Sequence, residues 1–263
     1  MPVISVLMSV YNGEKFLAES VRSILGQTFK DFEFIILDDG STDSTMPILD
    51  ELAKSDLRIK IIKNEKNLGL TLSLNKGLNC CIGKYIARQD VDDVSSLWRL
   101  EKQLAYMEAN PEVILSGSCG SYIDENSKKV CEKKLPLSYL EIKRKLMFNN
   151  QFIHSSLMIR RDVLQKEGGY NKEFGRAQDY ELILRLASKY PVANLGENLV
   201  SRRLSTISLS WQSKKQEWDA IRARWWGMTK YGYSILQGML NIILRLNWFL
   251  IPQKIKFIRY FFI

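Results

Sequence analysis

The sequence predicts an α/β fold in which a mostly parallel sheet is flanked by helices. Short apolar runs typical of buried strands recur at 4–10, 32–37, 58–63 and 85–88. Segments with the apolar spacing of an amphipathic helix lie between them, at 14–25, 44–54 and 70–81. Strands that alternate with helices at this spacing are typical of a parallel, doubly wound sheet with right-handed crossovers.

Each element of this first half is bounded by residues that favour a turn or end a helix. Gly13 follows the first strand in a turn, and Gly26 ends the first helix. The second strand is broken by the polar run 38–43. After the fourth strand, a helix is predicted at 96–109, where Pro111 stops it.

The second half of the chain is less regular. Its predicted elements are a strand at 113–118, a polar hairpin or loop at 122–134, a basic helix at 140–148, a strand at 152–159, a short helix at 161–166 and an amphipathic helix at 177–189. We expect one domain over residues 1–210, with halves at 1–110 and 111–210. Residues 211–263 form a helical tail that contains five of the six tryptophans.

Composition sets broad limits on function. The chain has 263 residues, 46% hydrophobic, which is enough for one large domain plus an appendage. Its formal net charge of +9 suits a polyanion, an anionic membrane surface or phosphorylated substrates, and does not choose among them. The four cysteines show no metal-ligand spacing, and reduced thiols in a cytoplasm are expected. The single histidine excludes any site that needs two imidazoles.

Three carboxylates stand within four residues, directly after the strand at 85–88. Asp90, Asp92 and Asp93 repel one another, and each raises the pKa of its neighbours unless a positive charge lies among them. A Mg²⁺ or Mn²⁺ ion, which commonly shares carboxylates with substrate phosphates, would relieve this repulsion. The alternative is an N-terminal cap, with Asp93 or Ser95 opening the next helix. The cluster alone does not decide between them.

Three stretches together resemble the family 2 glycosyltransferases of GT-A fold. They are ISVLMSVYN at 4–12, LDDGSTD at 37–43 and RQDVDD at 88–93, and the resemblance extends over about residues 3–210. No G-x-G-x-x-G follows the first strand, so a dinucleotide-binding dehydrogenase is disfavoured.

The resemblance implies a nucleotide-sugar donor, most often UDP-linked, at the first strand ends. Expected donor contacts are Val10, Tyr11, Asn12, Asp38, Asp39, Arg88, Asp90 and Arg203. The third stretch resembles the D-x-D motif, which implies Mn²⁺ or Mg²⁺ on Asp92, with Asp93 or Asp90 contributing. Two arginines have alternatives: Arg203 could pair with acids, and Arg88 could simply balance the aspartates.

The resemblance also implies a general base at the start of the helix at 177–189. The family usually carries Glu-Asp there, whereas this chain has Gln178 and Asp179, so the base role passes to Asp179 alone. Gln178 and His154 are expected on the acceptor side, with a hydrogen-bonded core position as the alternative for His154. Asp179 could instead be a plain helix cap.

Within the tail, residues 233–263 are rich in Leu, Ile, Phe and Trp, but Arg245 and Pro252 interrupt them, and Lys254, Lys256 and Arg259 lie near the end. A spanning helix needs about 18 or more consecutive apolar residues, which this stretch lacks. It suits the interface of an anionic bilayer, and the alternative is packing on the domain or on a second subunit. We therefore expect a cytoplasmic protein with peripheral membrane contact.

These expectations define an inverting, metal-dependent glycosyltransferase. Its partners would be a UDP-sugar and a glycan or lipid-linked acceptor in bacterial surface polysaccharide synthesis, without nucleic acid. A non-catalytic sugar-nucleotide or carbohydrate-binding module is one alternative, favoured only by Gln178. A nucleotidyltransferase is the other, but it would need a glycine-rich phosphate loop after the first strand.

Overall fold

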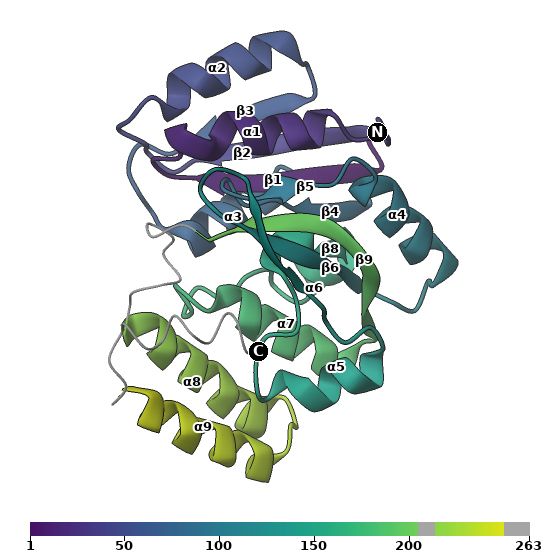
Figure 1. Cartoon of the computed structure of the whole chain (residues 1–263), viewed down its shortest axis with the longest axis vertical. Coiled ribbons are helices and arrows are strands. Elements are labelled where there is room, and N and C mark those ends of the chain that lie inside the picture. Colours follow the sequence, from purple (N-terminus) through teal and green to yellow (C-terminus); the bar gives the residue numbers. More distant parts are fainter. Residues whose placement is uncertain (205–213, 250–263) are drawn as a thin grey trace.

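The computed structural model describes residues 1–204 and 214–249. A single curled sheet runs through the molecule, with helices against both of its faces (Figure 1). The strand order is β3-β2-β1-β4-β8-β6-β9-β5, and β7 pairs with β6 outside this path. The predicted α/β class is therefore confirmed for the described residues.

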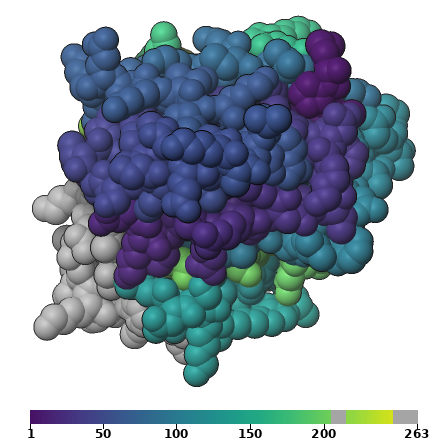
Figure 2. Space-filling model, turned by 90° about the horizontal axis from the view of Figure 1, so that it is seen from above, coloured from purple at the N-terminus to yellow at the C-terminus, as the bar shows by residue number. Residues whose placement is uncertain are grey.

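The first four strands are parallel neighbours, as predicted. They are β1 (Ile4–Val10), β2 (Phe32–Asp38), β3 (Ile59–Lys63) and β4 (Tyr85–Arg88). Ile4 faces Phe32 on one side and Tyr85 on the other. The crossover helices are α1 (Glu14–Leu25), α2 (Thr45–Ser55) and α3 (Leu70–Leu78). Their residues, purple to blue, make up most of the surface seen from above (Figure 2).

Side-chain alternation explains why these strands are apolar throughout. Val6 and Met8 pack into a core with residues of α1 and α2, whereas Leu7 packs on the opposite face with Leu74 of α3. Because both faces of a parallel sheet are covered by helices, its strands carry continuous apolar runs.

The second half adds antiparallel pairs, so the whole sheet is mixed. Its elements are β5 (Val94–Ser95), α4 (Arg99–Ala109), β6 (Leu115–Ile123), β7 (Lys129–Lys133), α5 (Tyr139–Leu146), η1 (His154–Ser156), β8 (Met158–Arg160), α6 (Arg161–Lys166), α7 (Gln178–Lys189) and β9 (Val192–Arg203). β8 runs antiparallel to both β4 and β6, while β6 and β9 are parallel. The polar hairpin is confirmed as β6 and β7.

The strand predicted at 152–159 is wrong over most of its length. His154–Ser156 form a 3₁₀ turn, and only Met158–Arg160 continue as a strand. The Ser156 hydroxyl donates to the carbonyl of Ile153 and accepts from the backbone N–H of Ser118. Serine hydroxyls that bond the local backbone in this way compete with a strand ladder.

The described part of the tail forms two helices, α8 (Lys214–Lys230) and α9 (Ile235–Phe249). They lie side by side next to α7 (Figure 1). The Arg224 side chain of α8 is fully buried and donates to the carbonyls of Met147 and Phe148. Helix α8, which precedes the stretch 233–263 expected at a membrane or packed on protein, is therefore packed on the domain. Within the described ranges, no helix is long and apolar enough to cross a bilayer.

Candidate functional site

The acidic loop after β4 lies where the carboxyl ends of the central strands meet. The backbone N–H of Asp39, just past β2, donates to the carbonyl of Val10 at the end of β1. The N–H of Gln89, just past β4, donates to the carbonyl of Leu7 in β1. Ligands of open α/β sheets bind outside these strand ends. The three stretches that carry the family resemblance therefore meet at one edge of the sheet.

The buried Arg88 side chain neutralises negative charge in the acidic loop. Its side chain is buried, one nitrogen donates to the carbonyl of Leu7 at 2.8 Å, and another lies 2.5 Å from Asp90 Oδ1. It also donates to the carbonyl of Gln89. These bonds fit the alternative in which Arg88 balances the charge of the aspartates, rather than the one in which it contacts the donor.

Asp90 is the most strongly paired of the three acids. His154 Nδ1 lies 3.3 Å from Asp90 Oδ2, and the Ser155 hydroxyl donates to the same oxygen at 2.8 Å. Burial opposes ionisation of Asp90, but Arg88 and then His154 outweigh it, so the pKa of Asp90 is lowered. The η1 turn supplies both His154 and Ser155, which is why the loss of a regular strand there matters for the site.

Asp92 and Asp93 are the acids whose ionisation the surrounding protein opposes. Burial, followed by the nearby Asp90 carboxylate, raises the pKa of Asp92. Burial and the charges of Asp92 and Asp90 raise the pKa of Asp93 well above its usual value. A cation placed between these carboxylates would reverse both shifts.

The donor set also limits how a metal could be held. Among residues 1–204 and 214–249, no group of three or more His, Cys, Asp or Glu side chains is arranged to hold a metal ion by itself. Mg²⁺ in phosphate-transfer sites commonly takes one or two carboxylates and completes its shell with substrate phosphates and water. Asp92 and Asp93 fit that kind of site.

Arg203 clamps the acidic loop. Its backbone N–H donates to Asp93 Oδ1 at 2.9 Å, and its Nε donates to the carbonyl of Asp92 at 2.9 Å. Its guanidinium also bonds the Asp124 carbonyl, the Ser127 hydroxyl and, at 2.6 Å, the Glu19 carboxylate. The side chain is 1% exposed, so its hydrogen bonds go to the protein.

The expected donor contacts at β1 and β2 differ in exposure. Asp39 is buried and accepts from Asn64 Nδ2 and from the N–H groups of Leu68 and Gly69, each at 2.8 Å. Tyr11, in contrast, is 46% exposed. Asp39 thus holds the 67–69 loop against the strand ends.

Asn12 and Asp38 order the loop that follows β2. Asn12 has φ 50°, and its Oδ1 accepts from the N–H of Thr42 at 2.9 Å. Asp38 Oδ1 accepts from the N–H of Ser41, while the buried Asp38 Oδ2 has no partner among the described residues. Val10, the last residue of β1, is buried.

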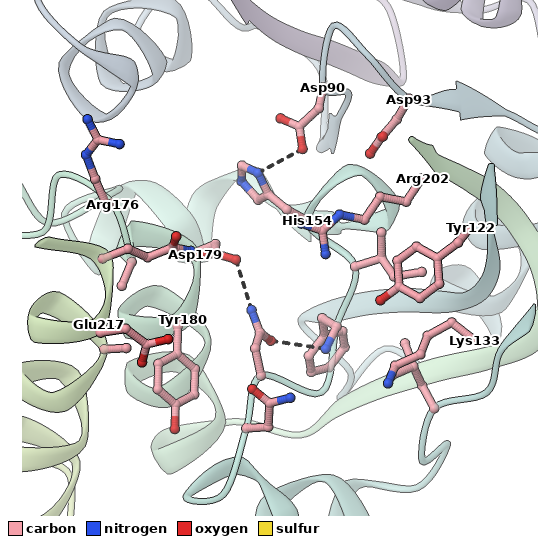
Figure 3. A pocket seen from close by; sticks show the side chains of 18 of the residues that line it. Asp90, Asp93, Tyr122, Lys133, His154, Arg176, Asp179, Tyr180, Arg202 and Glu217 are labelled. Atoms are coloured by element: carbon pink, nitrogen blue, oxygen red, sulfur yellow. Dashed lines mark hydrogen bonds and ion pairs between the residues drawn. The ribbon is translucent and has the colours of Figure 1, made fainter. Parts of the chain in front are cut away.

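A pocket of about 270 Å³ brings the acidic loop and Asp179 together (Figure 3). Asp90, Asp93 and His154 line it on one side, and Asp179, from the first turn of α7, lines it on another. Asn150 Nδ2 donates to Asp179 Oδ2 at 2.9 Å, which orients the carboxylate. Gln178, the residue before Asp179, is buried. Its Oε1 has no hydrogen-bond partner in the described chain.

Several pocket residues were missed by sequence reasoning. Asn150, Arg176, Tyr122, Lys133 and Arg202 all line the pocket. Tyr122 and Lys133 belong to the hairpin that was predicted only as a polar element. The available signal was that every second side chain of a strand points to the same face. The choice between Arg202 and Arg203 depends on strand register, which sequence alone does not provide.

Replacing Arg203 with methionine should loosen the acidic loop. The variant leaves the Glu19 carboxylate and two backbone carbonyls without a charged donor, so we expect the free energy of unfolding to fall by about 3 kcal/mol in urea titrations. Lys15→Met, which removes an exposed ion pair with Glu125, is the matched control and should change it by less than about 1 kcal/mol. Equal, small effects of the two variants would contradict the clamp.

Comparison with known proteins gives a direct family assignment. The family model described as Glycosyl transferase family 2 matches residues 5–168. The chain is 33% identical to the amylovoran biosynthesis glycosyltransferase AmsE of Erwinia amylovora, over 95% of each chain. It is 30% identical to the UDP-Gal:alpha-D-GlcNAc-diphosphoundecaprenol beta-1,3-galactosyltransferase of Escherichia coli, over 97% of this chain and 94% of that protein. A third relative, an uncharacterized glycosyltransferase of Haemophilus influenzae, is 38% identical over 77% of this chain, and the match spans 66% of its length.

Solved structures agree on the fold. The Staphylococcus aureus TarS fragment 1–349 in complex with UDP-GlcNAc has a TM-score of 0.75 at 18% identity, covering 94% of this chain and 72% of that chain. The mannosyltransferase PcManGT of Pyrobaculum calidifontis, in complex with GDP-Man and Mn²⁺, has a TM-score of 0.69 at 14% identity, covering 92% and 68%. With the family model spanning residues 5–168, the chain is a glycosyltransferase and belongs to glycosyl transferase family 2.

Proposed function

We propose that the chain transfers a sugar, with inversion, from a UDP-linked donor to a hydroxyl of a glycan or lipid-linked acceptor in bacterial surface polysaccharide synthesis. The observation that carries the proposal is that Asp90, Asp93 and Asp179 line the same pocket. The functions of the Erwinia and Escherichia relatives, in amylovoran biosynthesis and in galactosyl transfer to a diphosphoundecaprenol-linked sugar, support the pathway and the acceptor class.

The donor nucleotide is assigned to the ends of β1 and β2. The exposed ring of Tyr11 is available to stack on a base, and Asp39, Asp38, Asn12 and Val10 shape the surrounding loop. The S. aureus relative that was solved with UDP-GlcNAc supports a nucleotide-sugar ligand on this fold. Arg88, Asp90 and Arg203 contribute from beneath, by holding the acidic loop against the strand ends.

A divalent cation, Mn²⁺ or Mg²⁺, is assigned to Asp92 and Asp93. Two adjacent carboxylates whose pKa values are raised suit a cation that is shared with donor phosphates. The Mn²⁺ bound with GDP-Man in PcManGT supports this assignment. When bound, the cation would neutralise charge on the leaving diphosphate.

Asp179 is assigned as the general base. The acceptor oxygen forms its new bond to the anomeric carbon on the side opposite the diphosphate, and the old carbon–oxygen bond breaks with its electron pair going to that diphosphate. Asp179 takes the hydroxyl proton, and Asn150 fixes the orientation of its carboxylate. His154 and Gln178 are assigned to the acceptor side, where His154 also bridges Asp90 and the Tyr170 hydroxyl.

Peripheral membrane contact is assigned to α9, because its apolar face is turned outward. The buried positions of this helix include Gly238 and Asn241, and Arg245 pairs with Glu217. The exposed positions are Ile235, Leu236, Met239, Leu240, Ile243, Leu244 and Leu246. A helix packed on the core of a globular domain buries its apolar face, whereas α9 exposes it.

Charge favours an anionic lipid surface as the cover for that face. After Asp219 the sequence has no acidic residue, while it has seven basic ones: Arg222, Arg224, Lys230, Arg245, Lys254, Lys256 and Arg259. Arg224 is buried, and Arg222 and Arg245 pair with Glu173 and Glu217, so the charge offered to a lipid surface comes from the other four. Residues 250–263, which contain three of them, lie outside the described residues. Basic and aromatic residues beside an apolar helix face suit the interface of a bilayer on its cytoplasmic side.

The donor and metal are tested together. Screening UDP-, GDP- and dTDP-sugars should give hydrolysis of UDP-sugars that depends on Mn²⁺ or Mg²⁺. Asp92→Asn should weaken metal-dependent UDP binding by about tenfold or more in calorimetry, at an unchanged melting temperature. Asp50→Asn, on the exposed surface of α2, is the control. Equal UDP affinity of the Asp92 variant with metal present would show that the ligand assignment is wrong.

Asp179→Asn separates an enzyme from a sugar-nucleotide-binding module. Asparagine keeps the shape and can still accept the Asn150 hydrogen bond, so melting temperature and UDP affinity should stay near the parent values. Transfer to acceptor should fall by about 10²-fold or more, as expected for loss of a general base. Asp162→Asn, in the first turn of α6, is the matched control. If transfer persists, the base lies elsewhere, and His154 is the next residue to test.

Membrane contact is tested with liposomes rich in phosphatidylglycerol. The intact chain should sediment with them less as salt rises, because each interfacial Lys or Arg contributes about 1 kcal/mol. Leu240→Glu with Leu244→Glu should reduce binding by about tenfold and leave donor hydrolysis intact. Leu57→Glu is the control, because Leu57 is 94% exposed far along the sequence from α9. Unchanged sedimentation of the double variant would favour a protein partner for this face.

A further inference from the structure

One wall of the pocket is built by three neighbouring strands, and two of its side chains are cationic. Lys133 comes from β7, Tyr122 from β6 and Arg202 from β9, and all three line the pocket (Figure 3). We call these residues the cationic wall. In the figure the Tyr122 ring lies between the two cations, and the Arg202 guanidinium extends into the pocket on the side of His154.

Strand register explains why these side chains share one face. Tyr122 pairs with Arg202 on one side and with Cys131 on the other. Lys133 lies two residues beyond Cys131, so it points to the same face, and it pairs with Gly120, which has no side chain. A Cβ at Gly120 would lie 2.5 Å from the Val200 carbonyl, so the strands approach closely here.

The neighbouring Arg203 fixes the direction of Arg202. Successive residues of a strand point to opposite faces, and Arg203 is held in the acidic-loop clamp by Glu19 and the Asp92 carbonyl. Arg202 is therefore directed into the pocket.

Tyr122 and Lys133 lie on strands away from the donor half of the sheet, while Arg202 adjoins Arg203, which bonds the acidic loop. The nucleotide is assigned to the ends of β1 and β2, whereas β4 and β8 intervene before β6 in the strand order. In that order β9, which carries Arg202, lies one strand beyond β6, while β7, which carries Lys133, pairs with β6 outside the path. The other side of the pocket carries Asp179 (Figure 3), and Arg245 of α9 is also among the lining residues.

We propose that Lys133, Tyr122 and Arg202 form an anion subsite for a phosphate or diphosphate group of the acceptor. The inference rests on the proposed function, and it adds that the acceptor carries an anionic linker next to the sugar that receives the new bond. Ammonium, guanidinium and phenol groups are all donors, and together they suit phosphate oxygens. An anion held there leaves its sugar in the pocket with Asp179 and its lipid free to run toward the outward face of α9.

The test uses farnesyl diphosphate as a soluble probe. Protein is first saturated with UDP and Mn²⁺, so that the donor diphosphate site is filled, and the probe is then titrated by calorimetry. We expect one further binding event, weakened about tenfold or more by Lys133→Gln and by Arg202→Gln, with farnesol binding far more weakly. Lys134→Gln is the matched control, because Lys134 is exposed and lines a separate depression beside Gly196.

The outcomes distinguish this subsite from the donor site and from the proposed function. Probe that binds only in the absence of UDP, or a loss of UDP affinity rather than probe affinity in both variants, would assign the cationic wall to the donor and overturn the inference. Equal probe affinity in Lys133→Gln, Arg202→Gln and Lys134→Gln, with melting temperatures unchanged, would also overturn it. Failure of UDP and Mn²⁺ to bind the parent chain would instead contradict the proposed function.

Discussion

The site depends on holding three carboxylates together in a buried loop. Arg88 neutralises Asp90 from inside the sheet, and Arg203 clamps Asp92 and Asp93 through one backbone N–H and one side-chain bond. Beneath them Arg99, also fully buried, donates to the carbonyl of Arg88 and ties α4 to β4. Burial lowers the pKa of Arg99 to about 9, and Arg88 adds to that shift. Buried charges of both signs are tolerated here because they pair with one another and with the backbone. Removing one partner leaves another charge buried without compensation, which is destabilising.

Much of the first half could be predicted because local and global preferences agree there. The apolar run at 4–10 and its turn at Gly13 match β1 and the start of α1. The acidic loop was recognisable because carboxylates at a strand end are costly without a ligand or a counter-ion. The second half carried weaker signals. Residues 196–198 in the middle of β9 are exposed, which breaks the apolar pattern, so this strand was not anticipated.

Site residues from the second half were predictable by type but not by direction. Asp179 could be placed because the family resemblance implies a base at the start of the helix at 177–189, and the structure puts it in the pocket with the acidic loop. Arg202 and Arg203 are adjacent and identical in chemistry, and only the register of β9 against β6 separates a pocket residue from a clamp. The tail was expected to be amphipathic, but the outward direction of the apolar face of α9 depends on its tertiary partners. Its polar contacts, such as Arg245 with Glu217, form only once α8 is packed.

The clamp has a consequence for the order in which the molecule assembles. Arg203 lies 110 residues beyond Asp93 and 184 beyond Glu19, yet it bonds both. The contacts of α1 and of the acidic loop with Arg203 therefore form only after β9, the last strand in the sequence, has been synthesised. Contacts of such high sequence separation form late and slowly. Substitutions in β9 would thus delay maturation of a site to which most of that strand makes no direct contact.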